Sequence, residues 1–212
     1  MSEEYYNKIQ WDEDELHRWR SNDGDNTHLL NWDLNSNSRV IDVGSYNGDW
    51  LQKICNKYNC YGLGYEPTKK AFNQSLSKSS EKLSFMNCGI TTEPTSEMNI
   101  NVSEDQSTFV RNSNNFTEET VKMINAKELF ENSLNQYTID LIQINIEGYE
   151  YNLLPYMIDN NLLNNVKRLQ VQFHNISEHS DIRRKNICSH LNHIGFETKF
   201  DYKFVWYGAI RK

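Results

Sequence analysis

The sequence predicts a protein of the α/β class, with a mostly parallel central sheet, helices on both of its faces and a C-terminal antiparallel strand pair. From residue 39 onward, short apolar runs alternate with stretches of helical periodicity. Such alternation produces right-handed βαβ units, whose strands lie parallel in one sheet. The chain has 212 residues, which corresponds to about 1.4 domains at roughly 150 residues per domain. We therefore expect one domain with elaborations.

The first βα unit shows both patterns. Residues 40–43 form an apolar run interrupted only by an aspartate, which predicts a buried strand. Four apolar side chains then recur at helical spacing: Trp50, Leu51, Ile54 and Tyr58. They predict a helix over 49–58, with Asp49 near its positive N-terminus.

The remaining elements follow from the same two patterns. Further apolar runs predict strands over 61–65, 83–86, 139–144 and 166–173. Helical periodicity predicts helices over 69–76, 126–132, 149–158 and 181–194. Pro155 is expected to kink or shorten the third of these helices. Residues 98–124 are polar and predict an insertion of short strands, and residues 198–202 and 204–210 supply the closing antiparallel pair.

Residues 1–38 are polar and aromatic and form a segment of their own ahead of the main domain, residues 39–212. A short helix is expected over 12–19, with Leu16 and Trp19 on one side. Trp11 and Trp19 can either cover a ligand as a lid or pack against the sheet. The same segment can also connect the domain to a further module of a longer enzyme.

Composition and charge exclude several classes of protein. The 22 Lys and Arg residues against 29 Asp and Glu residues give a net charge of −7, with no long basic run. Nucleic-acid binding is therefore disfavoured, because it needs a concentrated positive face. No stretch approaches the roughly 20 apolar residues of a membrane span, and the first residues lack an apolar signal core. The four cysteines show no metal-ligand spacing, so we expect reduced thiols in a cytoplasmic protein.

A glycine-containing loop joins the first predicted strand to its helix. It reads Val40-Ile-Asp-Val-Gly44-Ser-Tyr-Asn-Gly48, in which Gly44 permits a tight turn and Gly48 a close approach. The dinucleotide fingerprint Gly-x-Gly-x-x-Gly is absent, and Asp42 would repel a phosphate while suiting a cationic ligand. Glu66, at the end of the second strand, can accept hydrogen bonds from two ribose hydroxyls. The loop resembles that of S-adenosylmethionine (SAM)-dependent methyltransferases; the alternative is a glycine turn without a ligand.

A second motif ends the strand predicted over 139–144. It reads Ile144-Asn-Ile-Glu-Gly148-Tyr-Glu and resembles the Ile-Asp/Asn-x-Glu-Gly-x-Glu segment of the FkbM-type family of SAM-dependent methyltransferases. The resemblance extends to residues 38–44, 64–67, 105–109, 170–174 and 204–206, and so covers most of the chain. Many relatives carry Lys and Asp where this chain has Gln143 and Asn145. The amide of Asn145 weakens a metal-ligand or base role there but can still donate and accept hydrogen bonds.

The resemblance implies a Rossmann-like class I methyltransferase fold, with SAM as cofactor and S-adenosylhomocysteine as product. It also implies O-methylation of a hydroxyl on a sugar or glycan. The sequence requires no metal, because the histidines show no metal-ligand spacing; Mg²⁺ held by carboxylates stays open. A methyltransferase for a non-sugar small molecule, or a non-catalytic SAM-binding or interaction domain, are the alternatives.

Most residues expected to contact the cofactor lie in the loops that follow predicted strands, where open α/β sheets bind ligands. They are Asp42, Gly44, Ser45, Tyr46, Gly48, Glu66, Asn87, Cys88 and Asn145. Glu66 is assigned to the ribose and Tyr46 to the methionine part, although Tyr46 is nearly as well explained as a surface aromatic. Asn87 and Cys88 follow the third strand, where adenine lies in this fold.

Three residues are candidates for catalysis. His174 is the first choice for the base that takes the acceptor proton, since it follows the fifth strand and its ordinary pKa is about 6.5. Glu147 is the second choice, although its charge also suits a helix N-terminus. Asn145 is expected to contact cofactor or acceptor. Trp206 and Tyr207 are expected to stack on a sugar face, with the core of the last strand as their alternative place.

Overall fold

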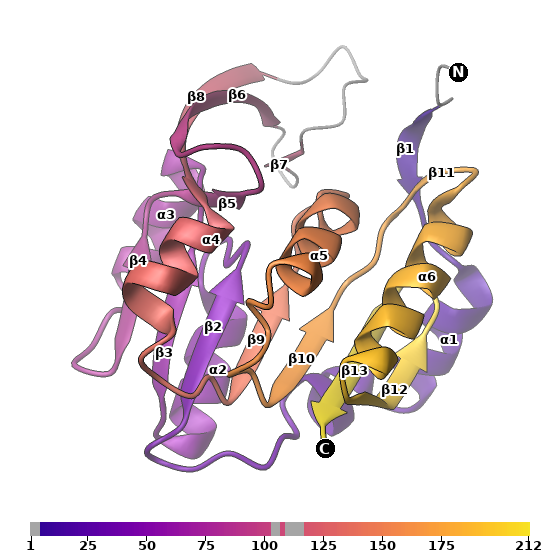
Figure 1. Cartoon of the computed structure of the whole chain (residues 1–212), viewed down its shortest axis with the longest axis horizontal. Coiled ribbons are helices and arrows are strands. Elements are labelled where there is room, and N and C mark those ends of the chain that lie inside the picture. Colours follow the sequence, from indigo (N-terminus) through magenta and orange to yellow (C-terminus); the bar gives the residue numbers. More distant parts are fainter. Residues whose placement is uncertain (1–4, 103–106, 109–116) are drawn as a thin grey trace.

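The computed structural model describes residues 5–102, 107, 108 and 117–212 (Figure 1). Within these residues, seven strands form the central sheet, in the order β12 (Phe196–Tyr202), β13 (Trp206–Arg211), β10 (Arg168–Val171), β9 (Leu141–Ile144), β2 (Arg39–Val43), β3 (Tyr61–Tyr65) and β4 (Leu83–Met86). The last five of these run parallel, whereas β13 is antiparallel to β10 and β12 is antiparallel to β13. The predicted fold class is confirmed.

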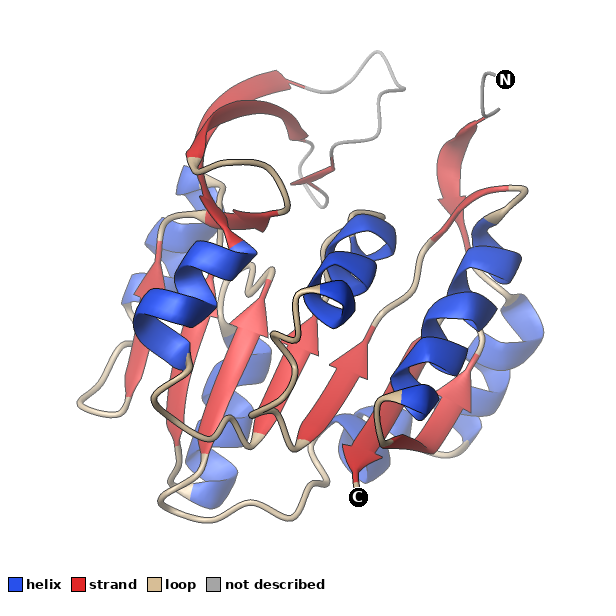
Figure 2. Cartoon of the chain, viewed as in Figure 1, coloured by secondary structure: helices blue, strands red, loops and turns tan. Residues whose placement is uncertain are grey.

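Helices cover both faces of this sheet (Figure 2). On one face lie α4 (Ala126–Leu129), the π-helical turn η2 (Phe130–Leu134), α5 (Glu150–Asp159) and α6 (Ser180–His193). On the other lie α1 (Glu13–Ser21), the π-helical turn η1 (Asp25–Leu29), α2 (Asp49–Tyr58) and α3 (Lys69–Leu76). Strand β2 shows why both faces are covered. Ile41 and Val43 belong to the core on the α5 side, and Val40 to the core on the α2 side, as expected for a parallel strand buried on both faces.

The polar insertion forms a second sheet of its own. Its strands lie in the order β5 (Gly89–Thr91), β8 (Thr117–Asn125), β6 (Ser96–Val102) and β7 (Ser107–Thr108). A small cluster of Ile100, Val121 and Met123 packs between β6 and β8, and the sheet lies beyond the carboxyl ends of β2 and β3 (Figure 1). Residues 105, 106 and 109 of the family-like segment 105–109 lie outside the described residues.

Helix α5 runs through Pro155 and keeps its expected length. A proline has no N–H, so the carbonyl four residues earlier loses its helical partner. That carbonyl belongs to Tyr151, and Arg183 of α6 approaches it with Nη2 at 3.4 Å. The predicted helix over 126–132 is different: α4 has one turn and continues as η2 to Leu134.

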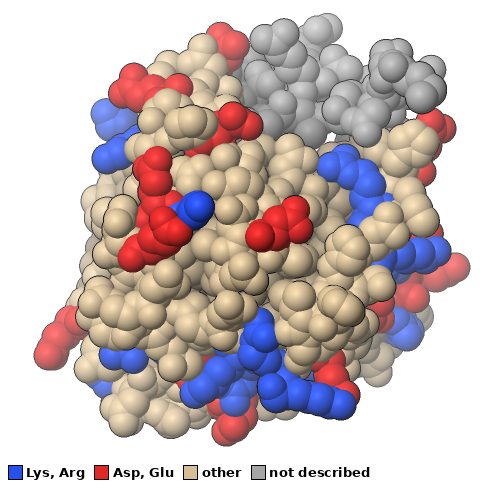
Figure 3. Space-filling view, viewed as in Figure 1, with Lys and Arg blue, Asp and Glu red and all other residues tan. Residues whose placement is uncertain are grey.

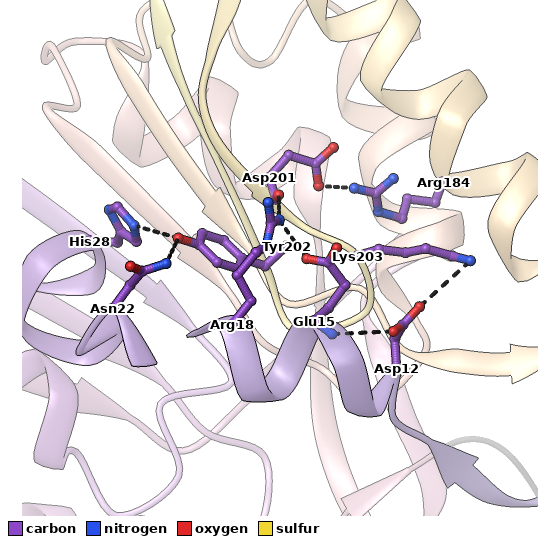
Figure 4. Close-up of polar contacts among 9 residues, drawn as sticks. All are labelled: Asp12, Glu15, Arg18, Asn22, His28, Arg184, Asp201, Tyr202 and Lys203. Atoms are coloured by element: carbon purple, nitrogen blue, oxygen red, sulfur yellow. Dashed lines mark hydrogen bonds and ion pairs between the residues drawn. The ribbon is translucent and has the colours of Figure 1, made fainter. Parts of the chain in front are cut away.

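The N-terminal segment packs against the C-terminal strand pair (Figure 4). Trp19 is buried, and its ring lies 5.0 Å from that of Tyr202, edge to face. Arg18 donates to the carbonyl oxygen of Asp201, and Asn22 and His28 contact the Tyr202 hydroxyl at 3.1 Å each. Trp19 therefore packs against the sheet rather than over a ligand.

Strand β1 (Tyr5–Gln10) continues this N-terminal segment to the carboxyl edge of the main sheet. It pairs antiparallel with β11 (Asn175–Ser177), which directly follows His174. No helix in the described part of the chain is both long and apolar enough to cross a bilayer.

Candidate active site

The loop between β2 and α2 is held in a left-handed conformation at three positions. The φ angles of Gly44, Tyr46 and Gly48 are 84°, 47° and 80°. The N–H groups of Gly44 and Ser45 both donate to the carbonyl oxygen of Tyr65 at 3.0 Å, which ties the loop to the end of β3. A Cβ on Gly44 would overlap with the carbonyl oxygen of Asn145, so the loops after β2 and β9 touch there. Gly44 thus makes the tight turn expected of it, and it also allows these two loops to approach each other closely.

Asp42 lies within β2 and is almost fully buried, with 1% of its surface exposed. Its Oδ1 accepts a hydrogen bond from Gln143 Nε2 at 2.9 Å, and its Oδ2 has no partner among the described residues. Burial raises the pKa of Asp42 to about 7, against the opposing effect of the Gln143 hydrogen bond; the negative charge of Glu66 raises it further. A nearby cation stabilises the ionised form of a buried carboxyl group such as this one.

The Gln143 amide belongs to a ladder of side-chain hydrogen bonds across the sheet. Gln143 Oε1 accepts from Gln170 Nε2 on β10, and Gln170 Oε1 accepts from the indole N–H of Trp32 at 2.7 Å. We call Asp42, Gln143, Gln170 and Trp32 the cross-sheet ladder. Each amide orientation is fixed by its neighbours, so the ladder supplies Asp42 with one donor and leaves Oδ2 free.

Three buried side-chain oxygens at this edge of the sheet have no hydrogen-bond partner in the described structure: Asp42 Oδ2, Ser45 Oγ and Asn145 Oδ1. Most buried polar atoms are paired, so each unpaired one calls for an explanation. Two of the three oxygens can only accept, and the hydroxyl can do so. A ligand that brings N–H donors and a positive charge would satisfy them. The ammonium and sulfonium of SAM have these properties.

Glu66 follows β3 and braces two loops. Its Oε2 accepts from the backbone N–H of Tyr46 at 2.9 Å, and its Oε1 accepts from the N–H and the hydroxyl of Thr68 at 2.9 and 2.6 Å. Burial raises the pKa of Glu66, and the Thr68 and Tyr46 hydrogen bonds act in the opposite direction. Because Oε2 accepts a single bond within the protein, it retains acceptor capacity for a ribose hydroxyl.

The other residues expected at the cofactor divide into two groups. Asn87 is exposed and donates to the carbonyl oxygens of Glu66 and Pro67 at 3.0 and 2.9 Å, so it shapes the loop after β3. Tyr46 lies within the loop between β2 and α2 and is 47% exposed. Cys88, in contrast, is 2% exposed and packs in the core on the α5 side. The structure corrects the expectation for the Cys88 side chain, which is a core residue.

The two aromatic residues expected at the acceptor face opposite sides of β13. Tyr207 is 1% exposed, lies edge to face against Phe173 at 6.1 Å, and contacts the Thr198 hydroxyl. Its ring is therefore part of the core, and its assignment to a sugar is wrong. Trp206 is half-buried on the α2 side, next to the carboxyl end of β10. Its role as a sugar platform stays a prediction.

His174 lies between two carboxylates. Its Nδ1 is 3.1 Å from Glu150 Oε1, and its Nε2 is 3.5 Å from Glu147 Oε2. Burial by itself lowers the pKa of His174, but the charges of Glu147 and Glu150 outweigh it and raise that pKa to about 10. At neutral pH the imidazole therefore already carries the proton that a general base would accept. This corrects our first choice for the base.

Gln170 and Glu150 are among the residues of the site that had no assigned role in the sequence analysis. Gln170 is a fully buried amide between the buried apolar residues Leu169 and Val171 of β10, and a polar residue at a core position is a signal that sequence alone can give. Glu150 is 0% exposed. Its position at the start of α5 suggests an ordinary helix-terminal charge, so the sequence carries no sign of its burial against His174.

Within the described residues, no group of three or more His, Cys, Asp or Glu side chains is arranged to hold a metal ion. The Glu147–His174–Glu150 arrangement is thus a hydrogen-bonded charge cluster. The four cysteines are free thiols.

The fold and the sequence of the chain were each compared with those of known proteins. Solved structures with a similar fold include fibrillarin in its complex with Nop5p (TM-score 0.50, 12% identity, 84% of this chain and 75% of that one). The METTL16 methyltransferase domain is also similar, with a TM-score of 0.50 and 12% identity over 92% of this chain and 67% of that one. Magnesium protoporphyrin IX methyltransferase from Synechocystis PCC 6803, with bound SAM, has a TM-score of 0.47, 14% identity, and coverages of 94% and 77%. The likenesses to fibrillarin and to the METTL16 domain show the fold, and no curated protein sequence matches significantly.

The sequence itself gives the more specific result. Residues 42–204 match the family described as the Methyltransferase FkbM domain. The match begins at the buried carboxylate of β2 and ends at Phe204, so it includes the two loops with unpaired oxygens, the insertion and the charge cluster around His174. The chain belongs to the FkbM methyltransferase family.

Proposed function

We propose that the protein is a SAM-dependent O-methyltransferase that transfers a methyl group to a hydroxyl of a sugar or glycan. The observation that supports SAM as the cofactor is the set of unpaired buried oxygens on Asp42, Ser45 and Asn145. They face a common sheet edge in a family of methyltransferases. The assignment of a sugar hydroxyl as the methyl acceptor rests on the family resemblance and on the position of Trp206 at the same edge.

The residues present fit SAM. Asp42 and Asn145 would accept from its ammonium, Ser45 would add a third acceptor, and Glu66 Oε2 would accept from a ribose hydroxyl. When bound, SAM supplies a methyl group that its sulfonium already activates. The protein then has mainly to align an acceptor oxygen with that methyl group and to exclude water, which gives a large rate advantage.

The charge distribution favours an uncharged acceptor over a nucleic acid. On the face seen in Figure 3, basic side chains gather along the lower edge, away from the carboxyl ends of the parallel strands (Figure 1). The net charge of the chain is −7. Polyanions bind to concentrated basic surfaces. We further propose a cytoplasmic enzyme without membrane insertion, acting alone or as one module of a larger glycan-synthesising enzyme.

Calorimetric titration with SAM and with S-adenosylhomocysteine tests the cofactor. We expect micromolar binding of both by the wild-type protein and a loss of at least tenfold in Glu66→Ala, because the ribose acceptor and the brace of the β2–α2 loop disappear together. Glu81→Ala, which removes an exposed carboxylate between α3 and β4, is the matched control and should bind normally. Absence of binding by folded wild-type protein would disprove the proposal.

A non-catalytic SAM-binding domain is the second candidate, because Asn145 stands where many relatives carry a carboxylate. Transfer of tritium from methyl-labelled SAM to a panel of monosaccharides and glycans separates the two. Binding with labelled product supports the enzyme, and binding without any product favours the second candidate.

A further inference from the structure

The charge cluster around His174 is graded in exposure from the core to the edge of the sheet. The side chain of Glu150 is 0% exposed, that of His174 is 3% exposed and that of Glu147 is 21% exposed. All three lie where β9 and β10 end: Glu147 in the loop after β9, Glu150 at the start of α5, and His174 after β10. Of the three, only Glu147 is open enough to meet an acceptor molecule.

The carboxyl group of Glu150 is held in place in the interior by hydrogen bonds. Its Oε2 accepts from the N–H of Gly148 at 2.8 Å, and its Oε1 accepts from the backbone N–H of His174 at 2.7 Å. The same Oε1 is 3.1 Å from His174 Nδ1. A buried carboxylate needs such hydrogen bonds and a neighbouring cation, since desolvation is otherwise costly. His174 provides that cation.

The orientation of the imidazole determines its protonation. Both ring nitrogens face carboxylate oxygens, Nδ1 towards Glu150 and Nε2 towards Glu147. A neutral imidazole would direct the lone pair of one nitrogen at a carboxylate oxygen, which is repulsive, whereas an imidazolium donates from both. The Tyr151 hydroxyl on α5 donates to the His174 carbonyl oxygen at 2.9 Å, and burial raises the pKa of Tyr151, so this neighbour stays neutral.

The backbone around Glu147 directs its side chain to this position. Glu147 has a φ of 51°, a conformation that non-glycine residues seldom adopt, and Gly148 follows with a φ of 107°. Non-glycine residues in left-handed backbone cluster at active sites and ligand clamps. The loop is further held by the Gly148 hydrogen bond to Glu150.

We propose that Glu147 accepts the proton of the methyl-acceptor hydroxyl, and that His174, held between Glu147 and Glu150, is the positioning residue for it. The inference rests on the proposed methyltransferase function. As the acceptor oxygen bonds to the methyl carbon, the methyl–sulfur bond breaks and its electron pair stays on sulfur. The O–H proton passes to Glu147, whose carboxylate becomes a carboxylic acid, while His174 keeps its own proton throughout.

Nitrogen-15 NMR of the imidazole tests the protonation of His174 without any acceptor. In the wild-type protein at pH 8, both His174 nitrogens should be protonated. In Glu150→Gln, the imidazolium of His174 should lose a proton at a lower pH than in the wild-type protein, because one of the two stabilising carboxylates is gone. Glu178→Gln, which breaks the exposed pair of Glu178 and His179, should leave the His174 signals unchanged. A neutral His174 at pH 7 in the wild-type protein would overturn the proposal.

Turnover is measured with methyl-labelled SAM and the sugar and glycan panel. Glu147→Gln should lower kcat by roughly 10²–10⁴-fold, the usual contribution of a general base, while SAM affinity stays within twofold. His174→Gln should lower kcat and leave the KM for SAM unchanged, and Glu178→Gln should have wild-type turnover. Circular dichroism confirms that each variant folds. Wild-type kcat in Glu147→Gln would also overturn the proposal.

The results separate this inference from the function on which it rests. If wild-type protein fails to bind SAM, the proposed function fails. If SAM binds normally but His174 is neutral, only the inference fails.

Discussion

Replacement of Gly44 by alanine is expected to destabilise the protein by roughly 2–5 kcal/mol and to abolish SAM binding. The φ of 84° costs a residue with a Cβ about 1–2 kcal/mol. The added Cβ would also overlap with the backbone carbonyl of Asn145 and lie 3.0 Å from Ile146 Cγ2, and overpacking of this kind costs about 1–3 kcal/mol. Because the obstacle is backbone, no side-chain rotation can relieve it. The loops after β2 and β9 would have to separate. The unpaired oxygens on these loops would then also move apart.

Gly195→Ala is the matched control for this effect. Gly195 also has a positive φ, 96°, but the nearest atom to an added Cβ is Arg211 Nη1 at 3.7 Å. Only the backbone strain of about 1–2 kcal/mol is expected there, with SAM affinity retained. Urea unfolding of both variants gives the two free energies, and calorimetry gives the affinities. Equal losses of stability in the two variants, or normal SAM binding by Gly44→Ala, would contradict the packing argument.

Asp42→Asn is expected to have opposite effects on cofactor binding and on the stability of the ligand-free protein. A cationic ligand binds the ionised carboxylate, whose pKa burial has raised to about 7. Wild-type affinity for SAM should therefore fall about tenfold per pH unit as the pH decreases below 7. Asp42→Asn should bind at least tenfold more weakly at pH 8, in line with about 1.5–3 kcal/mol for a hydrogen bond to a charged group. Its affinity should not follow that pH dependence. Calorimetry from pH 5.5 to 9 measures both.

The stability of the ligand-free protein should change in the other direction. The unfolded Asp42 carboxyl titrates near 3.8 and the folded one near 7, so the folded state holds an extra proton between these values. The stability that this proton provides is complete below pH 3.8 and is lost as the pH rises through 7, which amounts to about 4 kcal/mol. The Asp42→Asn variant, whose amide does not titrate, undergoes no such loss. Thermal melts should therefore show this variant as the more stable protein above pH 7, and identical pH profiles would refute the buried-carboxylate argument.

Much of the site could be predicted because parallel strands end at a common edge. Asp42, Glu66, Asn145 and His174 lie in or after different strands, and the sheet brings their ends together as the alternation of elements implied. The polar insertion was also visible in its composition, although its arrangement as a separate sheet, starting with β5, was not.

The residues that the sequence misassigned depend on contacts that have no local signature. Trp206 and Tyr207 are neighbours, so the alternation of a strand sends them to opposite faces, and nothing in their order indicates which one is buried. The protonation of His174 depends on Glu150, 24 positions away. Because a helix-terminal glutamate is ordinarily solvated, only the folded structure shows that this one is enclosed.

Because residue 143 lies next to Asp42 in the cross-sheet ladder, its side chain determines whether Asp42 releases a proton to the solvent when SAM binds. Apart from Asp42, all members of the ladder are neutral, so nothing in the ladder compensates the charge of Asp42 before a cation arrives. Uptake of SAM near neutral pH should then expel a proton into the buffer, which titrations in buffers of different ionisation enthalpy would detect. A lysine at position 143 would place a permanent positive charge beside the same carboxylate. Binding of SAM would then release no proton, and the positive charge of SAM would compete with that of the lysine for the Asp42 carboxylate.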